Sequence, residues 1–347
     1  MRLTGELRPE VELTRLPLVT LYLSERCNSR CVSCDYWRHG TADLNLAAVR
    51  MLLPDLARLR TEVVLLSGGE PLLNPEWGQI AETLRQAGLR LWLLTSGLSL
   101  AKHASRAARL FDMITVSLDG TNRETYNAIR GLDAFDKVCQ GVRAAVSAGA
   151  EVTVRVTLQR SNYRQLPAFV ELAHRLGVRQ LSFLAVDVAN PHAFGRTDSF
   201  AADLALQADD IPVFEQLLCR LERDSAQDFH SAFIAESPQK LRRILQYFTA
   251  VKGNSPYPAV RCNAPEFSAV IDAKGHVSPC FFIPGPPHVG DTVADLTGAL
   301  QTPAMQALRA QIRAGARAEC SRCVCSMWRD VTDAGAAGLE SPRRAVL

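Results

Sequence analysis

The sequence predicts an α/β protein built on a parallel β-sheet, and three observations carry this prediction. Short runs of β-branched and leucine residues alternate with amphipathic helical stretches, six such strand–helix units follow one another, and glycines stand where the helical stretches stop. Repeated βα units force right-handed crossovers and therefore parallel strands. The pattern leaves two architectures open, an open doubly wound sheet and a full or partial (β/α) barrel.

Apolar runs predict six strands, and glycines mark the ends of the helices between them. The strands are expected at Val19–Leu23, Val63–Leu66, Leu91–Leu94, Met113–Ser117, Val152–Leu158 and Gln180–Leu184. The clearest helices are Glu76–Ala87, Phe135–Ala148 and Leu166–Leu176, stopped by Gly88, Gly149 and Gly177. In both architectures, the loops that follow the strands carry the chemistry.

Composition excludes several classes of protein. The 347 residues are 47% hydrophobic, which suits one large or two modest domains and excludes a disordered chain. A net charge of +3, dispersed along the chain, predicts neither a nucleic-acid nor a membrane partner. Met1–Leu18 lacks the apolar stretch of a secretory signal, and no run approaches the ~18 apolar residues of a membrane span. We therefore expect a cytoplasmic protein.

The ten cysteines point to metal or catalysis, because the cytosol keeps thiols reduced. Two of them, Cys139 and Cys219, fall within helical patterns and are expected to be buried apolar thiols. The other eight form one group near the start of the chain and one near its end. These are Cys27, Cys31 and Cys34, then Cys262, Cys280, Cys320, Cys323 and Cys325.

The first group has the spacing C-x3-C-x2-C in the loop after the first predicted strand. Three thiolates are one fewer than a closed tetrahedral site needs. A [4Fe-4S] cluster held by three cysteines leaves one iron open to a small ligand. A structural zinc site completed by His39 is the alternative.

With these cysteines after the first of six strands, the chain resembles the radical S-adenosylmethionine (SAM) enzymes. The resemblance implies a partial (β/α)6 TIM-like barrel and covers about Leu18 to Val186. It continues after strand two with Ser67-Gly68-Gly69-Glu70-Pro71, similar to the family's GGE motif, which holds the ammonium of SAM. Glycines let a backbone approach a ligand, and an acid suits an ammonium.

Further SAM contacts are implied at the later strands. Thr95-Ser96-Gly97 resembles the family's T-N-G turn, with Ser96 in place of asparagine, and Ser117-Leu118-Asp119-Gly120 resembles its S-[IL]-D-G segment. Arg155 lies where the family places a residue that reaches the SAM carboxylate, a task that suits a guanidinium fork. Arg130 is a second candidate, or a solvated arginine at a helix end. Ser33 replaces a usual aromatic residue, so adenine contact falls to Tyr36 or Trp37.

The second cysteine group follows a proline-marked linker. Phe267–Ile271, a turn at Asp272–Gly275 and His276–Ser278 predict a β-hairpin. The pattern C-x12-G-x4-C, followed by C-x2-C, resembles the front half of the SPASM extension and more closely its shortened twitch form. Cys262, Cys280, Cys320 and Cys323 would then hold a second [4Fe-4S] cluster, and a zinc ribbon is the alternative. Cys325 could replace Cys323 as a ligand, donate a hydrogen atom, or be spare.

The resemblance implies reductive cleavage of SAM to a 5′-deoxyadenosyl radical that abstracts hydrogen from a substrate. A fully ligated second cluster would accept an electron, which favours oxidation of a carbinol to a ketone. The loop after strand six carries Asp187, His192 and Arg196 as candidate catalytic groups, or as a loop bonded to itself. By resemblance we expect a dehydrogenase of a small sugar or aminocyclitol in an aminoglycoside-type antibiotic pathway, supplied with electrons by a flavodoxin or ferredoxin.

Three other functions stay open: an epimerase that uses Cys325 or Cys139, a maturase of ribosomal peptides, and a non-enzymatic iron-sulfur or zinc protein. Met1–Leu18 is short for a leader-binding domain, which favours a small-molecule substrate. The expected organisation comprises five parts. They are an N-terminal segment (1–17), a radical SAM barrel (18–200), a helical bridge (201–254) with helices at Asp209–Arg223 and Ser237–Val251, an auxiliary cluster domain (255–330) and a tail (331–347).

Overall fold

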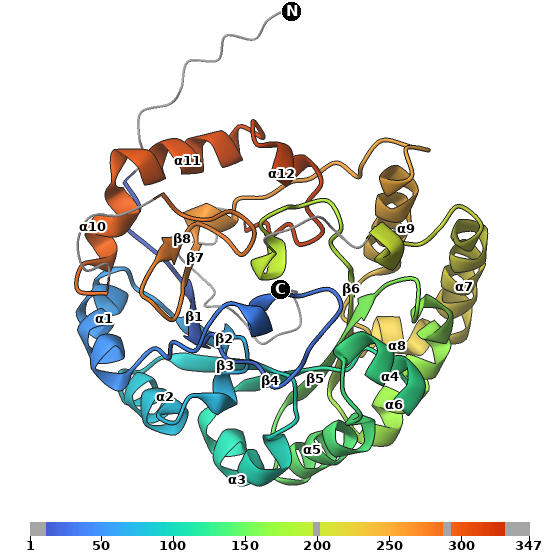
Figure 1. Cartoon of the computed structure of the whole chain (residues 1–347), viewed down its shortest axis with the longest axis horizontal. Coiled ribbons are helices and arrows are strands. Elements are labelled where there is room, and N and C mark those ends of the chain that lie inside the picture. The colour runs from blue at the N-terminus through green and yellow to red at the C-terminus, as the bar shows by residue number, and fades with distance from the viewer. Residues whose placement is uncertain (1–11, 197–201, 287–292, 330–347) are drawn as a thin grey trace, which may run out of the picture.

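The computed structural model describes residues 12–196, 202–286 and 293–329. Within these ranges one curved sheet is wrapped on its outer side by helices (Figure 1). Most of the predicted N-terminal segment and all of the predicted tail lie outside the described residues.

In the described chain the sheet has eight strands in the order β6-β5-β4-β3-β2-β1-β7-β8. Every pair of neighbouring strands in this order is parallel except the last pair, β7 and β8, which is antiparallel. Because β6 and β8 end this order, the barrel is partial and open. The strands are β1 (Leu18–Ser24), β2 (Val63–Gly68), β3 (Arg90–Thr95), β4 (Met113–Ser117), β5 (Val152–Leu158), β6 (Gln180–Ala185), β7 (Ser268–Ile271) and β8 (Val277–Ser278).

The helices that connect the first six strands cover the outer face. They are α1 (Leu46–Arg58), α2 (Trp77–Gln86), α3 (Leu100–Leu110), α4 (Arg123–Arg130), α5 (Phe135–Ser147) and α6 (Leu166–Leu176). Local chemistry sets their ends: the side chains of Asn45 and Asn122 accept from the backbone at Ala48 and Thr125, a cap that stabilises a helix by about 1 kcal/mol. The predicted stops are confirmed, since Gly88, Gly149 and Gly177 have φ of 82°, 86° and 68°.

The second half of the chain closes around the open side of the barrel (Figure 1). The bridge contains α7 (Asp210–Asp224), α8 (Ala226–His230) and α9 (Pro238–Val251), and the extension contains β7, β8, α10 (Leu296–Gln301), α11 (Pro303–Arg313) and α12 (Ala318–Ser321). The predicted hairpin is confirmed, and it also extends the barrel sheet, because β7 runs parallel to β1 with Ser268 opposite Leu18.

The two helical cysteines differ in exposure. Cys139 is buried in α5, as predicted. The prediction for Cys219 is wrong, because this thiol is exposed on α7. Phe214, Leu218 and Leu221 form the buried face of α7, and a residue that directly follows Leu218 lies about 100° around the helix from it.

None of the described helices combines the length and apolar character that crossing a bilayer requires.

Candidate active site

Three cysteines occupy the loop that follows β1. Cys27, Cys31 and Cys34 are all partly buried. Burial raises the pKa of Cys27 to about 11 and that of Cys34 to about 12. Such thiols are protonated at neutral pH, and a bound metal is what converts them to thiolates. The loop therefore offers three neighbouring sulfur donors that suit an iron-sulfur cluster.

The end of α4 holds this cysteine loop. The backbone N–H groups of Arg30 and Val32 donate to the carbonyls of Arg130 and Ile129 at 2.9 and 3.0 Å. The last carbonyls of a helix have no partner within it, so they are free to accept. Gly131 then leaves the helix with φ of 73°, and a Cβ there would lie 2.4 Å from the Arg30 carbonyl oxygen. Only glycine allows the loop this close.

The loop after β2 packs against the same cysteine loop. The N–H groups of Gly69 and Glu70 donate to the carbonyls of Ser24 and Arg26, both at 2.8 Å. A Cβ on Gly69 would lie 2.3 Å from the Arg26 carbonyl oxygen, so the second glycine of the motif is required sterically. The structure thus brings this motif against the cysteine loop, and its contact with SAM stays a prediction.

The Glu70 carboxylate links two of the loops at this edge. It is fully buried, and it accepts from Thr95 Oγ1 at 2.8 Å, Ser96 N at 2.7 Å and Leu72 N at 3.1 Å. Ser96 Oγ in turn donates to Asn28 Oδ1 at 3.0 Å. These contacts give Glu70 a positioning role in the protein itself, and its predicted contact with an ammonium stays a prediction.

Asp119 and Arg130, both predicted to contact SAM, form a buried ion pair. Arg130 Nη1 lies 3.0 Å from Asp119 Oδ2, and the side chains are 12% and 4% exposed. Asp119 Oδ1 accepts from Thr157 N at 2.7 Å. Burial raises the pKa of Asp119, and the guanidinium opposes this shift. Arg130 is therefore held at the cysteine loop as a buried cation rather than as a solvated one.

Ser117 and Arg155 stand opposite each other at the ends of β4 and β5. Arg155 Nε is buried and has no hydrogen-bond partner within the described residues. Burial also lowers the pKa of this guanidinium. A buried cation with donors to spare suits an anionic ligand, as predicted for the SAM carboxylate.

The two adenine candidates have different surroundings. Tyr36 packs edge-on against Tyr22 with ring centroids 5.5 Å apart. Trp37 lies under the guanidinium of Arg38, at 4.4 Å from the ring centroid. His39, the imidazole of the zinc alternative, is exposed. Either aromatic ring stays a candidate for the adenine.

The loop after β6 is mostly bonded to itself. Asp187 is fully buried, and its Oδ1 accepts from Ala189 N and Asn190 N, both at 2.9 Å. Arg196 donates to the carbonyls of Asp187 and Ser33 at 2.5 and 3.1 Å. His192 is exposed. The structure thus gives Arg196 structural partners, whereas Asp187 Oδ2 is buried without a partner within the described residues.

The same loop joins the two cysteine groups. Asp35 N, next to Cys34, donates to the Phe194 carbonyl at 2.9 Å. Phe194 packs edge-on against Phe282 at 5.6 Å, and Asn190 Nδ2 donates to the Phe282 carbonyl at 3.3 Å. Phe194 has a φ of 56°, a strained value that the surrounding contacts must hold.

All five C-terminal cysteines line one cavity. They are Cys262, Cys280, Cys320, Cys323 and Cys325. Burial raises the pKa of Cys280 to about 11, and it raises the pKa of Cys320 and Cys323 as well. No three His, Cys, Asp or Glu side chains of the described chain stand close enough together to hold a single metal ion. The shared cavity and its sulfur lining fit a second cluster.

Two charged residues that interact with Arg155, namely Lys240 and Glu236, were not expected from the sequence. Cys325 is partly buried and interacts electrostatically with Arg155 and Lys240. Glu236 is buried two residues before α9, where it accepts from Ser182 Oγ at 2.9 Å and from Phe183 N at 2.7 Å. Neither Lys240 nor Glu236 belongs to a motif, and a charged residue on an amphipathic helix carries no signal of inward placement.

Comparison with known families agrees with this geometry. Residues 21–173 match the radical SAM superfamily, and residues 262–324 match SPASM, an iron-sulfur cluster-binding domain. The chain therefore contains a radical SAM domain, which binds SAM and a [4Fe-4S] cluster, followed by a SPASM domain, which binds additional iron-sulfur clusters.

Two relatives and one structure illustrate the similarity. The chain is 24% identical over 264 residues to Fe-coproporphyrin III synthase of Methanosarcina barkeri, covering 71% of this chain and 66% of that protein. It is 34% identical over 172 residues to pre-heme d1 synthase of Dinoroseobacter shibae, covering 48% and 42%. Streptococcus suis SuiB bound to S-adenosylmethionine superposes with a TM-score of 0.64 at 12% identity, covering 95% of this chain and 76% of SuiB, which shows the fold alone. The chain thus spans 66% and 42% of the lengths of the two relatives.

Proposed function

We propose that this chain is a radical SAM oxidoreductase that removes a hydrogen atom from a carbinol carbon of its substrate, and then a proton from the hydroxyl group and an electron from the resulting radical, giving a ketone. When bound, a cluster on Cys27, Cys31 and Cys34 would supply the electron that cleaves SAM, and a second cluster in the C-terminal cavity would accept the electron from the substrate. The observation that carries the proposal is the pair of cysteine sites, joined by the loop after β6.

The chain's own residues would bind and orient SAM. The Gly69 and Glu70 backbone, held against the cysteine loop, would bind the ammonium of SAM. Arg155, whose buried Nε has no partner among the residues that the structure describes, would donate to the carboxylate, alongside Ser117. The buried Asp119–Arg130 pair and the Glu70–Thr95–Ser96 bonds would position these loops. Tyr36 or Trp37 would contact the adenine.

Asp187 is the proposed proton acceptor for the carbinol. Its Oδ2 atom has no partner within the described residues, and burial raises the pKa of the carboxyl group. A raised pKa makes a carboxylate a better base near neutral pH. Arg196 would act by positioning, since it fixes the loop to the Ser33 carbonyl beside Cys34. Cys325 remains the candidate hydrogen donor of an epimerase.

The proposed substrate is a small polyol, as expected from the sequence. An aminocyclitol or other amino sugar belongs to the same class, because Asp187 Oδ2 has no hydrogen-bond partner within the described residues and could accept from an ammonium group. The relatives named for tetrapyrrole synthesis and the peptide-bound form of SuiB keep a tetrapyrrole and a peptide as alternatives.

One anaerobic assay tests the proposal. The protein is reconstituted with iron and sulfide, reduced with dithionite and incubated with SAM, with and without aminoglycoside precursors, coproporphyrin or peptide. The proposal predicts 5′-deoxyadenosine and, with a polyol, a product lighter by two hydrogens. Absence of 5′-deoxyadenosine under every condition would refute the enzyme assignment. An inverted carbon of unchanged mass would favour the epimerase.

A further inference from the structure

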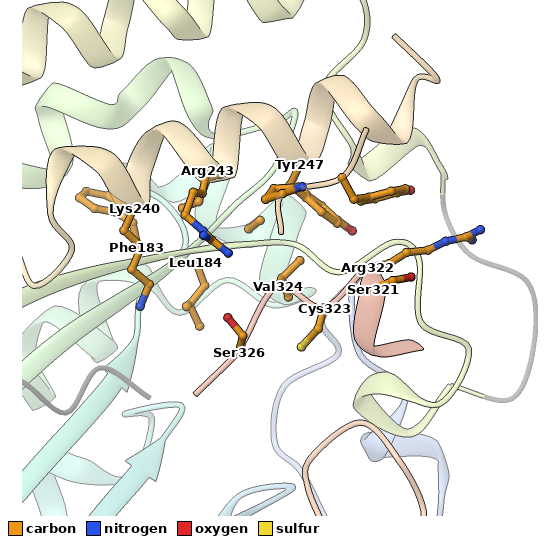
Figure 2. Close-up of a pocket in the computed structure, with 14 residues that line it drawn as sticks. Phe183, Leu184, Lys240, Arg243, Tyr247, Ser321, Arg322, Cys323, Val324 and Ser326 are labelled. Carbon is orange, nitrogen blue, oxygen red and sulfur yellow. The ribbon is translucent and has the colours of Figure 1, made fainter. Parts of the chain in front are cut away.

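A pocket open to solvent lies between β6, α9 and the C-terminal cysteine segment. Figure 2 shows Lys240 and Arg243 pointing from α9 toward this space, with Cys323 and Ser326 on the opposite side. Tyr247 and Tyr257 supply aromatic walls, with ring centroids 5.9 Å apart.

The charged side chains that line this pocket are all cationic. Its lining includes Lys240, Arg243 and Arg322, and no acidic residue of the described chain belongs to the lining. Arg243 donates to the Ala259 carbonyl at 2.5 Å, and Arg322 lies 5.7 Å from the centroid of the Tyr257 ring. Three cations within one concave surface repel one another, so an anion bound among them would be stabilised.

Lys240 connects this pocket to the barrel interior. It interacts electrostatically with Glu236, whose two oxygens already accept from Ser182 and Phe183. Lys240 also interacts with Cys325 and Arg155, and Arg155 is the proposed partner of the SAM carboxylate. A ligand group at Lys240 would therefore sit beside the proposed SAM site.

We propose that this pocket is a binding subsite for an anionic oxygen group of the substrate, a carboxylate or a phosphate, recognised by Lys240 and Arg243 with Arg322 at the rim. The inference rests on the proposed function, because it assigns the charge class of the substrate of that enzyme. The cationic lining suits a polyol that carries one anionic oxygen group, and the two tyrosine rings would pack against the carbon ring of such a ligand.

Calorimetric titration of the full reconstituted chain with citrate and with inorganic phosphate tests the subsite. Saturable binding of citrate alone identifies a carboxylate site, and binding of phosphate alone identifies a phosphoryl site. Lys240→Gln should weaken binding about tenfold or more, and Lys240→Arg should restore most of it. Arg322→Gln gives a second, exposed variant that tests the rim.

Arg242→Gln is the matched control. Arg242 lies on the same helix, but its guanidinium pairs with Glu222 on the exposed side of the molecule. The control should bind as tightly as the unmodified chain. Equal loss in Lys240→Gln and Arg242→Gln, or no saturable binding of either anion, would overturn the proposal. Binding of an acidic flavodoxin but of neither small anion would also overturn it, because the face would then dock a redox protein.

The two proposals fail separately. The same preparation is assayed for 5′-deoxyadenosine without any substrate. Anion binding that depends on Lys240, without 5′-deoxyadenosine, would leave the subsite standing and refute the proposed function. Formation of 5′-deoxyadenosine without anion binding that depends on Lys240 would refute only the subsite.

Discussion

Replacing Asp119 with asparagine tests whether the buried pair with Arg130 organises the SAM-binding edge. The side-chain amide introduced by Asp119→Asn could still accept from Thr157 N, so the main loss would be the charge opposite a guanidinium that is only 12% exposed. Removing one partner of a buried ion pair costs about 3–5 kcal/mol. With 347 residues and an unfolding entropy of roughly 2.1 cal/mol/K per residue, this loss lowers the melting temperature by about 4–7 °C.

Thermal melting of the anaerobically reconstituted chain without SAM measures this effect. Asp136→Asn is the matched control, because Asp136 and Arg123 form an exposed pair with side chains 62% and 67% exposed. The control should cost at most about 1 kcal/mol. Equal shifts for both variants would refute the stabilising role of the Asp119 pair. An unchanged melting temperature with weaker SAM binding would mean that Asp119 acts on the ligand directly.

Three further changes probe the loops around the site. Gly131→Ala places a Cβ against the Arg30 carbonyl oxygen at a residue whose φ is positive. Iron bound at the first site should therefore fall several-fold, while the absorbance of the second cluster remains. Unchanged iron would contradict the anchoring role of α4. Burial raises the pKa of Asp187, so a base at this position is inactive at low pH and becomes active as the pH rises through a pKa above the usual ~3.9. Asp187→Asn should slow turnover about 100-fold or more and remove the acidic limb of the pH–rate profile. If that limb persists in the variant, Asp187 is not the base. Arg196→Gln removes the guanidinium that donates to the Ser33 carbonyl. The variant should change the spectrum of the reduced cluster at the first cysteine site without loss of its iron. An identical spectrum would exclude a positioning role for Arg196.

The fold was largely predictable because each strand is a local apolar run. The predicted strands lie within two residues of the observed ones, and the hairpin at Ser268–Ser278 was predicted from its turn. Its pairing with β1 was not predictable, because Leu18 and Ser268 lie far apart in the chain and no local pattern chooses between sheet edges. The exposure of Cys219 was within reach, since Phe214, Leu218 and Leu221 already mark the inner face of α7.

The parts of the site in which a sequence motif determines the backbone conformation were predictable. The hydrogen-bond and charge partners of its side chains were not. Gly69 lies against the cysteine loop because its missing Cβ allows the contact, which a motif can encode. The bonds of Glu70 to Thr95 and Ser96, and the approach of Lys240 to Cys325, depend on the relative placement of whole elements. That placement comes from tertiary packing, which sequence periodicity does not contain.

The iron content of two multiple variants tests the central claim most directly. The unmodified chain, reconstituted anaerobically with two [4Fe-4S] clusters, should hold about eight irons. Replacing Cys27, Cys31 and Cys34 with alanine should remove about four irons and all 5′-deoxyadenosine formation, and replacing Cys262, Cys280, Cys320 and Cys323 should remove the other four or so. Loss of all iron from the first variant, or zinc in place of iron at either site, would contradict the account.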